Sequence, residues 1–336
     1  MALSFGTGII MNKGKGPALL EVRDLKKHFL PRKRFLQEQA PPVRAVDGIS
    51  FTLQAGETLG LVGESGCGKS TAARTLLRLI EPTSGQISFC GKNLTDIPET
   101  EMRALRREMQ IIFQDPYSSV NPARRIGRIL QEPFEIHGFQ NKKEKTEKAA
   151  QLLERVGLPP EHFNRYPHEL SGGQLQRVGI ARAIALNPKL VVADEPVSAL
   201  DVSIQAQIIN LLSDLKEQLD ISYLFISHDM GVVEYFCDRV AVMYFGKIVE
   251  LANSEQIYNS PQHPYTTALL NAIPNLESGR IKQEAPIKGD IPDPGNPPQG
   301  CAFQSRCPLK EKQCAEEIPA LKEIAPGHYA ACFLKQ

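Results

Sequence analysis

The chain has 336 residues, 42% of them hydrophobic and 23% charged, and its formal net charge is +1. This length favours one large domain with an appendage, and the near-neutral charge disfavours broad electrostatic binding of nucleic acid. No apolar run approaches the roughly 18–20 residues that a membrane-spanning helix needs. The first residues also lack the basic segment that opens a signal peptide. We therefore expect a cytoplasmic chain that meets a membrane only through partner proteins.

The strands and helices of the first three-quarters of the chain follow two patterns. LLEVRDLKKHFL and VRAVDGISFTL are typical of paired strands around an exposed loop. TLGLVG predicts a short buried strand, and STAARTLLRLI after it has the periodicity of a helix. Further along, KLVVAD, SYLFISH and RVAVMYFG occur among helical segments such as IQAQIINLLSDLKEQL. This alternation predicts an α/β fold with a mostly parallel sheet and helices on its faces.

We divide the chain into three parts by these patterns. Residues 1–18 are expected to form a loose leader, residues 19–255 the main domain and residues 256–336 a C-terminal extension. Within the main domain, about residues 98–180 are rich in helical patterning, and KKEKTEKAAQLLERVGL is the clearest amphipathic piece. GDIPDPGNPPQG predicts a linker or irregular loop inside the extension.

A Gly-rich loop, GESGCGKS, lies between the short buried strand and its helix. Glycines let such a loop curl until its N–H groups point inward at a triphosphate, and Lys69 can then reach the β- and γ-phosphates. The Ser70 hydroxyl can bind Mg²⁺, and the helix that opens there adds its positive N-terminal dipole. A loop between a predicted strand and a predicted helix has the context that the phosphate-binding pattern requires. The candidate ATP-binding residues of this loop are Gly63, Glu64, Ser65, Gly66, Cys67, Gly68, Lys69, Ser70 and Thr71.

A second buried strand, LVVADE, ends in two acids, Asp194 and Glu195. An acid at the carboxyl end of a parallel strand lies at the edge of the sheet where ligands bind. We expect Asp194 to hold Mg²⁺ through water. Glu195 is placed to orient or deprotonate the water that attacks the phosphate. Alone, such a run is typical of a strand leaving the core, and the phosphate loop is what favours the catalytic interpretation.

The sequence LSGGQ opens a predicted helix and forms a second anion-binding helix N-terminus on the same chain. One nucleotide does not need two such sites from one molecule. A head-to-tail pair of chains does, because each triphosphate then lies between the phosphate loop of one chain and the LSGGQ of the other. We therefore expect a dimer in which Ser171, Gly172, Gly173 and Gln174 contact the ATP of the partner.

With these motifs in this order, the chain resembles the ATP-binding cassette (ABC) family over about residues 19–251. The resemblance implies a P-loop NTPase fold with a mostly parallel core sheet, an antiparallel β subdomain and a helical subdomain. It also implies ATP and Mg²⁺ as cofactors and an ATPase activity coupled to transport, in which Glu195, His228 and Lys69 are catalytic. Two ATPs would close the dimer, and hydrolysis would reopen it.

The resemblance implies further site residues, position by position. Phe29 matches the aromatic residue that stacks on adenine, and Gln114 matches the glutamine that touches Mg²⁺ and faces the membrane subunits. Ser198 and Asp201, in SALD, match the loop that crosses the dimer interface. His228 matches the switch histidine that contacts the γ-phosphate and supports the catalytic glutamate.

Two segments narrow the resemblance to the oligopeptide/dipeptide importers, and most closely to the second, or F, type of dipeptide-importer ATPase. They are QDPYSSVNP, which begins at the candidate glutamine, and HPYT in the extension. The resemblance implies a homologous second ATPase subunit or a second copy of this chain, and two integral membrane permease subunits. It also implies an indirect link to an extracytoplasmic peptide-binding protein, and a peripheral position at the cytoplasmic face of the inner membrane.

Four of the seven cysteines, Cys301, Cys307, Cys314 and Cys332, fall in the last part of the chain. Four thiolates in a short irregular segment are what a Cys₄ metal site needs, and a metal can supply folding free energy that such a segment lacks. Structural zinc usually shows tighter cysteine pairs, and the longer gaps here suit an iron–sulfur cluster at least as well. The family resemblance implies a [4Fe–4S] cluster, with Zn²⁺ as the alternative.

Three other functions stay open at this stage. An importer of nickel or another small solute would share these features, because substrate choice lies in the binding protein and the membrane subunits. A soluble cassette ATPase acting on DNA or ribosomes usually carries long coiled-coil insertions or two cassettes, and this sequence shows neither. A regulatory cassette that binds ATP without hydrolysing it would not need an intact Glu195 and His228.

Overall fold

The computed structural model describes residues 17–30, 41–272, 292–293 and 295–336 of the chain. Most of the expected leader and of the loop between the first two strands lies outside the described residues, as does part of the Pro/Gly-rich stretch. Among the described residues, no helix is long and apolar enough to cross a membrane. The chain forms two compact units: the first combines residues up to 54 with residues 59–97 and 228–336, and the second combines residues 55–58 and 98–227.

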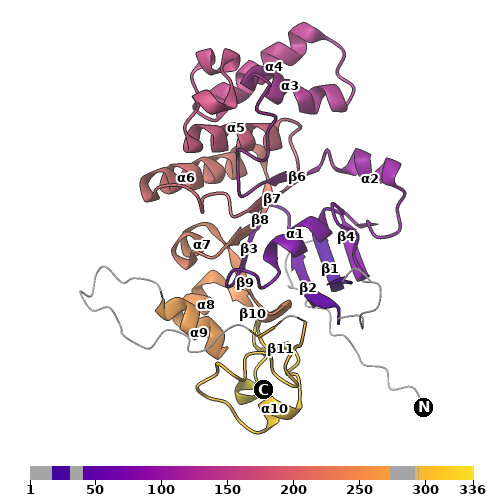
Figure 1. The fold of residues 1–336 in the computed structure, drawn as a ribbon, viewed down its shortest axis with the longest axis vertical. Coiled ribbons are helices and arrows are strands. Elements are labelled where there is room, and N and C mark those ends of the chain that lie inside the picture. The colour runs from indigo at the N-terminus through magenta and orange to yellow at the C-terminus, as the bar shows by residue number, and fades with distance from the viewer. Residues whose placement is uncertain (1–16, 31–40, 273–291, 294) are drawn as a thin grey trace, which may run out of the picture. The chain divides into compact units, whose positions relative to one another are not determined.

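The first unit contains an antiparallel sheet built near the start of the chain (Figure 1). Its strands, in the order β2-β1-β4-β5, are β1 (Leu20–Phe29), β2 (Val43–Leu53), β4 (Ser84–Phe89) and β5 (Lys92–Asn93). The antiparallel pairing of β1 with β2 confirms the paired strands predicted around the exposed loop. Val22, Leu25, Val46 and Ile49 are buried between more exposed neighbours, so one face of this sheet belongs to the core.

A second sheet in the first unit carries the strand before the phosphate loop. Its strands, in the order β11-β12-β10-β9-β3, are β3 (Thr58–Val62), β9 (Arg239–Tyr244), β10 (Lys247–Asn253), β11 (Lys322–Ala325) and β12 (His328–Ala330). β3 and β9 are parallel, and the other pairs are antiparallel. The helices of this unit include α1 (Lys69–Leu76), α7 (Met230–Phe236), α8 (Ser254–Asn259), α9 (Pro264–Asn271) and α10 (Gln313–Glu316).

The C-terminal extension is more regular than its composition predicts. β12 pairs with β10 in the register Glu250 to Ala330 and Leu251 to Tyr329, which adds the β11–β12 hairpin to the edge of the sheet. A strand edge presents unpaired N–H and C=O groups, and another strand can satisfy them. The prediction of an irregular extension is therefore wrong for residues 322–330, because the partner strand lies far away in the sequence.

The second unit contains three parallel strands and a group of helices (Figure 1). The strands, in the order β8-β7-β6, are β6 (Met109–Ile112), β7 (Leu190–Asp194) and β8 (Ser222–Ser227). The helices include α2 (Glu99–Leu105), α3 (Ile126–Ile136), α4 (Lys142–Arg155), α5 (Gly172–Ile184) and α6 (Val202–Leu219). Every residue of β7 and β8 is buried, as expected of parallel strands with both faces covered. The predicted parallel pairing is confirmed for this stretch.

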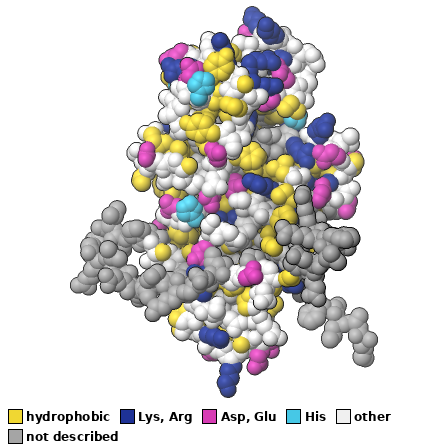
Figure 2. Space-filling model, in the orientation of Figure 1, with side chains coloured by type: hydrophobic (Ala, Val, Ile, Leu, Met, Phe, Trp, Pro, Cys, Tyr) yellow, Lys and Arg dark blue, Asp and Glu magenta, His cyan; other side chains and the backbone are white. Residues whose placement is uncertain are grey.

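The surface of α3 and α4 mixes basic and acidic side chains (Figure 2). Glu135 pairs with Arg128 at 2.9 Å and with Lys145 at 3.2 Å, and Arg124 pairs with Glu132 at 2.9 Å. Exposed pairs of this kind contribute little to stability. The lysine-rich start of α4, KKEKTEK, is thus a solvated helix face that carries charges of both signs.

Candidate functional site

The phosphate loop lies between β3 and α1 in the first unit and approaches neighbouring backbone too closely for a side chain. Gly68 has a φ of 109°, and a Cβ atom there would lie 2.0 Å from the carbonyl oxygen of Ala45. A Cβ atom on Gly63 would lie 2.2 Å from the carbonyl oxygen of Met243. Only glycine fits at these two positions, which gives the spacing of the sequence motif its physical reason.

Lys69 points back into its own loop. The residue is buried, and its ammonium donates hydrogen bonds to the carbonyl oxygens of Gly63 at 2.7 Å and Glu64 at 2.9 Å. An ammonium group has three donors and can exchange such acceptors for phosphate oxygens. Cys67 is buried beside it, and burial raises the pKa of the Cys67 thiol, so this side chain is uncharged.

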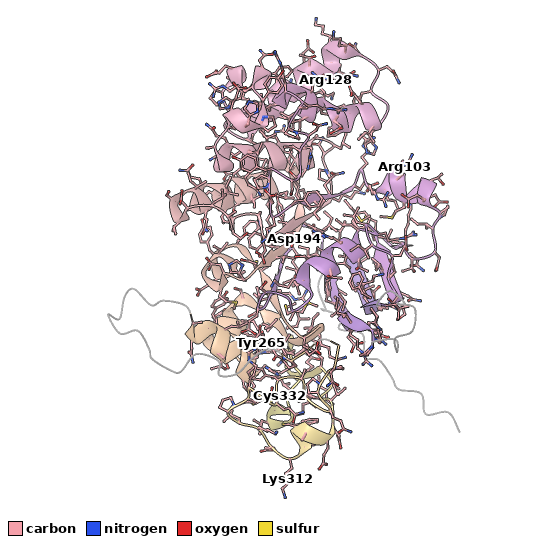
Figure 3. All side chains as sticks on the ribbon, viewed as in Figure 1. Arg103, Arg128, Asp194, Tyr265, Lys312 and Cys332 are labelled. Atoms are coloured by element: carbon pink, nitrogen blue, oxygen red, sulfur yellow. The ribbon has the colours of Figure 1, made fainter. Side chains whose placement is uncertain are left out.

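Asp194 and Glu195 lie at the carboxyl end of β7 in the second unit, where the sequence predicts them (Asp194 is labelled in Figure 3). Asp194 is buried, and Glu195 has a φ of 48°, in the left-handed region that residues other than glycine rarely adopt. Backbone strain of this kind clusters at functional sites. The side-chain amide of Gln114 donates a hydrogen bond to the Glu195 carboxylate at 3.0 Å. Two candidate residues that are 81 positions apart in the sequence are therefore in contact.

The candidate dimer-interface loop connects β7 with α6. The hydroxyl of Ser198 donates to the carbonyl oxygen of Glu195 at 3.1 Å, which closes a tight turn directly after the two acids. Asp201 precedes α6, and its carbonyl oxygen accepts the N–H groups of Ile204 and Gln205 at 2.9 Å. Hydrogen bonds thus hold the loop at both ends, and one of these bonds is accepted by the candidate catalytic residue Glu195.

The N-terminus of α5 carries the candidate second anion site. The Ser171 hydroxyl accepts the N–H of Gln174 at 3.3 Å, and the Gln174 side chain accepts the N–H of Ser171 at 3.0 Å, so the two residues cap the helix reciprocally. A Cβ atom on Gly173 would lie 2.6 Å from Cγ2 of Ile204 on α6, so the close approach of the two helices requires glycine. The first turn of a helix has N–H groups without intrahelical partners, and Gly172 and Gly173 can present theirs to an anion.

Two other candidate residues belong to the first unit, and each lies where a strand ends. His228 follows β8 directly, and the next residue, Asp229, caps α7 by accepting backbone N–H groups. Phe29 ends β1 with 40% of its surface exposed, and the Lys27 ammonium lies 5.1 Å from its ring centroid. An exposed ring at a strand end can stack on a base. The structure divides the candidate residues between the units: the phosphate loop, Phe29 and His228 belong to the first, and Gln114, Ser171, Gly172, Gly173, Gln174, Asp194, Glu195, Ser198 and Asp201 to the second.

The HPYT sequence is organised by a buried carboxylate. Glu250, on β10, is fully buried and accepts the N–H groups of Gln262 at 2.7 Å and His263 at 2.8 Å. It is also hydrogen-bonded to Nε2 of His328 on β12 at 2.7 Å. His263 in turn caps α9, because its Nδ1 accepts the N–H of Tyr265 at 3.1 Å. A buried carboxylate needs such partners, and this network therefore joins α9 and the extension to the sheet.

The stability of the protein should fall as the pH is lowered through the titration range of His263. Burial lowers the pKa of His263 to about 4, from its ordinary value of 6.5. The unfolded chain takes up a proton near pH 6.5, whereas the folded chain resists protonation until about pH 4. The contribution is therefore fully present above pH 6.5 and is lost as the pH falls towards 4, by roughly 3 kcal/mol in total. Urea unfolding across this range measures it.

The variant His263→Asn provides the matched control for this pH dependence. Asparagine keeps an acceptor for the helix cap but does not titrate. Its unfolding free energy should therefore lose the part of the pH slope that His263 contributes. An unchanged slope in the variant would assign the effect to another group.

The four cysteines of the extension surround one cavity. Cys301, Cys307, Cys314 and Cys332 line it together with His263, Gln304 and a majority of apolar residues (Cys332 is labelled in Figure 3). Its volume, including the open mouth, is about 320 Å³. All four are free thiols. Burial raises the pKa of Cys301 to about 11 and also raises the pKa values of Cys307 and Cys332, which keeps these thiols protonated. Within the part of the chain that the structure describes, no three or more His, Cys, Asp or Glu residues are arranged to hold a metal ion.

Two contacts of the phosphate loop have no counterpart among the sequence motifs. The carboxylate of Glu64 forms an ion pair with Arg306 of the extension, 242 positions away. The only local signal is an arginine beside a cysteine, which matches no motif. The second contact comes from the HPYT segment, which the sequence motifs link only to the oligopeptide/dipeptide importers: the Tyr265 hydroxyl accepts the N–H of Glu64.

Comparison with known proteins identifies this architecture. Residues 46–198 match the ABC transporter family, and residues 249–314 match the family described as the C-terminal region of oligopeptide/dipeptide transporters. The oligopeptide transport ATP-binding protein AppF of Bacillus subtilis is 51% identical over 327 residues, which cover 96% of this chain and 99% of that protein. A putative peptide import ATP-binding protein of Brucella ovis is 53% identical over 315 residues, which cover 94% of this chain and 97% of that protein.

Solved structures agree with the sequence relatives. A dimeric ATP-binding cassette in a post-hydrolysis state, bound to ADP and Pi, has a TM-score of 0.62 and 27% identity, covering 70% of this chain and 98% of that one. CbiO1 from Clostridium perfringens, part of the cbiONQ transporter complex, has a TM-score of 0.61 and 27% identity, covering 72% and 91%. The fold and motifs thus define an ABC-type ATPase, a transporter subunit that hydrolyses ATP. Within that class, the chain belongs to the ATP-binding subunits of oligopeptide/dipeptide ABC importers.

Proposed function

We propose that this chain binds and hydrolyses ATP to energise the import of di- and oligopeptides. The observation that carries the proposal is the presence of an ABC core and an oligopeptide/dipeptide C-terminal region in one chain. The AppF relative, which is named for oligopeptide transport, matches nearly the full length of both chains. Substrate choice would lie in the membrane and binding subunits, so the peptide class rests on these relatives.

In the first unit, we assign Lys69 to the β- and γ-phosphates, Ser70 to Mg²⁺ and Phe29 to adenine. The rest of the phosphate loop, from Gly63 to Thr71, would surround the phosphates with N–H groups. Two features support this assignment: the loop has glycine where no side chain fits, and the Lys69 ammonium already binds oxygen atoms inside the curl.

In the second unit, we assign Asp194 and Gln114 to Mg²⁺ and Glu195 to the attacking water. The hydrogen bond from Gln114 orients the Glu195 carboxylate, as a general base requires. His228 would contact the γ-phosphate. Phosphoryl transfer needs little covalent chemistry from the protein, so positioning and electrostatic stabilisation by Lys69 and Mg²⁺ would supply most of the rate.

The working state would be a dimer of cassettes closed around two ATPs. Ser171, Gly172, Gly173 and Gln174 would contact the ATP of the partner, and the loop from Ser198 to Asp201 would cross the interface. The dimeric cassette among the structural relatives supports this arrangement. The partner would be a homologous, non-identical ATPase or a second copy of this chain.

The remaining partners would be membrane proteins. The cassette dimer would bind two integral permease subunits at the cytoplasmic face of the inner membrane and, through them, would serve an extracytoplasmic peptide-binding protein. In this proposal residues 19–255 form the cassette, with a helical subdomain at about residues 98–180, and residues 256–336 form the extension. Movement of the Gln114 region on closure would transmit the conformational change to the permeases.

Peptide uptake by proteoliposomes tests the proposed function. The complex is purified from its native membrane through a tag on this chain, reconstituted, and supplied with MgATP and a labelled peptide. We expect uptake with the wild-type chain and none with Glu195→Gln. Uptake of nickel in place of peptide would assign the chain to the small-solute importers, and a tagged chain that brings no integral membrane protein with it would contradict a transport role.

We propose a [4Fe–4S] cluster as the cofactor of the extension, with Zn²⁺ as the alternative, because four cysteines line one cavity. The other residues that line the cavity are mostly apolar, with His263 and Gln304 among them, and soft thiolate ligands suit such a cluster. Cys301, Cys307, Cys314 and Cys332 would hold it. When bound, the cluster would stabilise thiolates and link four points of the extension, which adds folding free energy.

Anaerobic purification of the full chain should therefore yield about four irons and four sulfides per chain, with visible charge-transfer absorbance. Cys314→Ser should lose both iron and colour and should unfold at a lower temperature, whereas Cys90→Ser, at an exposed cysteine outside the cavity, should keep them. A colourless preparation without iron would refute the cluster. Zinc at about one ion per chain would favour the alternative.

A further inference from the structure

The extension contacts the phosphate loop through Glu64, the second residue of that loop. Nη1 of Arg306 lies 2.6 Å from Oε2 of Glu64, and Nη2 lies 2.9 Å from Oε1. Two parallel bonds between a guanidinium and a carboxylate are among the strongest and most specific polar contacts in proteins. The Arg306 side chain is 4% exposed and that of Glu64 is 26% exposed. The pair is therefore a shielded contact with defined geometry.

A second contact holds the backbone of the same residue. The N–H of Glu64 donates a hydrogen bond to the Tyr265 hydroxyl at 2.8 Å (Tyr265 is labelled in Figure 3). The Tyr265 ring lies 4.6 Å from that of Tyr244 and 5.4 Å from that of Phe303, centroid to centroid, and the Arg306 guanidinium lies 5.9 Å from the Tyr244 ring. Packed aromatic rings restrict one another, so this cluster keeps both contacts to Glu64 in place.

Arg306 belongs to the turn that forms one wall of the cysteine cavity. It directly precedes Cys307, and its N–H donates to the carbonyl oxygen of Phe303 at 3.0 Å. Cys301, Phe303 and Cys307, all in the same turn, line the cavity. The conformation of this wall therefore decides where the guanidinium of Arg306 lies.

Charge gives this contact a consequence for nucleotide binding. A carboxylate within a phosphate loop repels a triphosphate, and over a few ångströms that repulsion is only partly screened at physiological salt. The positive charge of the Arg306 guanidinium offsets the negative charge of the Glu64 carboxylate. Lys69 also binds the carbonyl oxygen of Glu64 at 2.9 Å, so a displaced Glu64 would move an acceptor of the phosphate-binding lysine.

We propose that Arg306 is a positioning residue for ATP binding. It neutralises Glu64 and fixes the first turn of the phosphate loop, so that the wall of the cysteine cavity sets the affinity of the chain for MgATP. The inference rests on the proposed function of the loop and adds to it a link from the extension to the nucleotide. Arg306 acts through Glu64 and need not touch ATP.

Equilibrium binding of MgATP to the full-length chain, at low and at high salt, tests this inference. Arg306→Gln leaves the Glu64 carboxylate uncompensated, so the Kd should rise roughly 10-fold at low salt. The increase should be smaller at high salt, because salt screens the repulsion. The double variant with Glu64→Gln should bind more tightly than Arg306→Gln alone, because no carboxylate remains to be neutralised. A defect that is insensitive to salt and is not relieved by Glu64→Gln would reduce Arg306 to a structural role and overturn the inference.

Three further variants sharpen the result. Lys312→Gln removes a positive charge from the same segment at an exposed position (Figure 3) and should leave the Kd unchanged. Arg306→Lys keeps the charge but loses the bidentate geometry, so it should give an intermediate Kd, and it serves if Arg306→Gln does not fold. Cys307→Ser should raise the Kd in the wild-type background and add nothing to Arg306→Gln. If the changes in Kd caused by Cys307→Ser and Arg306→Gln were additive, the cavity would not act through Arg306.

Failure of the inference is distinguishable from failure of the proposed function. A wild-type chain that does not bind MgATP contradicts the proposed function of the loop. A wild-type chain that binds MgATP, together with an Arg306→Gln variant that binds it equally tightly, contradicts only the role of Arg306. Thermal unfolding of each variant verifies that binding is measured on folded protein.

Discussion

Glu195→Gln should reduce ATP hydrolysis by about 10²- to 10⁴-fold, the usual contribution of a general base, while MgATP binding stays close to that of the wild type. Glutamine has nearly the shape of glutamate but cannot accept the proton of the attacking water. Its side-chain oxygen can still accept the hydrogen bond that Gln114 donates at 3.0 Å, so the local geometry is retained. Phosphate release and the Kd for MgATP, measured on the same preparation, separate the two effects.

An exposed glutamate on α6 offers the matched control for this variant. Glu217→Gln removes a carboxylate of the same kind away from the end of β7 and should hydrolyse ATP at the wild-type rate. Because Glu195→Gln binds ATP without consuming it, the closed dimer should also accumulate, which size-exclusion chromatography with MgATP detects. Hydrolysis within a few-fold of the wild type would refute the role assigned to Glu195.

Gly68→Ala should both destabilise the protein and remove MgATP binding. The added Cβ atom would lie 2.0 Å from the Ala45 carbonyl oxygen and 2.9 Å from Cε of Met243, at a φ of 109°. The backbone of the loop must shift to relieve this clash, and the lysine that follows it must move as well. We expect the free energy of unfolding to fall by about 3 kcal/mol or more, as for other clashes at a strained backbone position. Urea unfolding and nucleotide binding measure the two effects.

Gly91→Ala separates the clash from the cost of the backbone conformation. Gly91 lies in the turn between β4 and β5 with a φ of 76°, and a Cβ atom there would meet nothing within 4 Å. Only the left-handed conformation should lower the free energy of unfolding, by about 1–2 kcal/mol, and MgATP binding should be unchanged. If the two variants were equally stable and bound MgATP equally well, the close approach of the phosphate loop to Ala45 would have no functional consequence.

The parts of the site that could be predicted from the sequence are contiguous motifs. GESGCGKS lies between a buried strand and a helix. Its glycines are predictable because the loop must curl tightly, and the structure places Gly63 and Gly68 against neighbouring backbone. LVVADE is a buried strand with acids at its end because one short segment supplies both features. The capping box of LSGGQ is equally local, since Ser171 and Gln174 are three residues apart.

The parts that could not be predicted join distant segments. The contact of Gln114 with Glu195 spans 81 positions, and that of Glu64 with Arg306 spans 242. Neither pair has a spacing that an amino-acid pattern could indicate, because chain folding decides which side chains meet. The pairing of β12 with β10 was missed for the same reason, since β12 is only three residues long and lies in a tail that is rich in turn residues.

The sequence alone determined the phosphate loop, the acid-ended strand and the capped glycine-rich helix, because each depends on local backbone conformation and on residue types within a few positions. It also predicted that a nucleotide would need two chains. Only the tertiary structure decided what the extension contacts. Folding brings Tyr265 and Arg306 to Glu64 and four cysteines to one cavity, because burial of an aromatic cluster and a shielded ion pair depends on segments far apart in the chain.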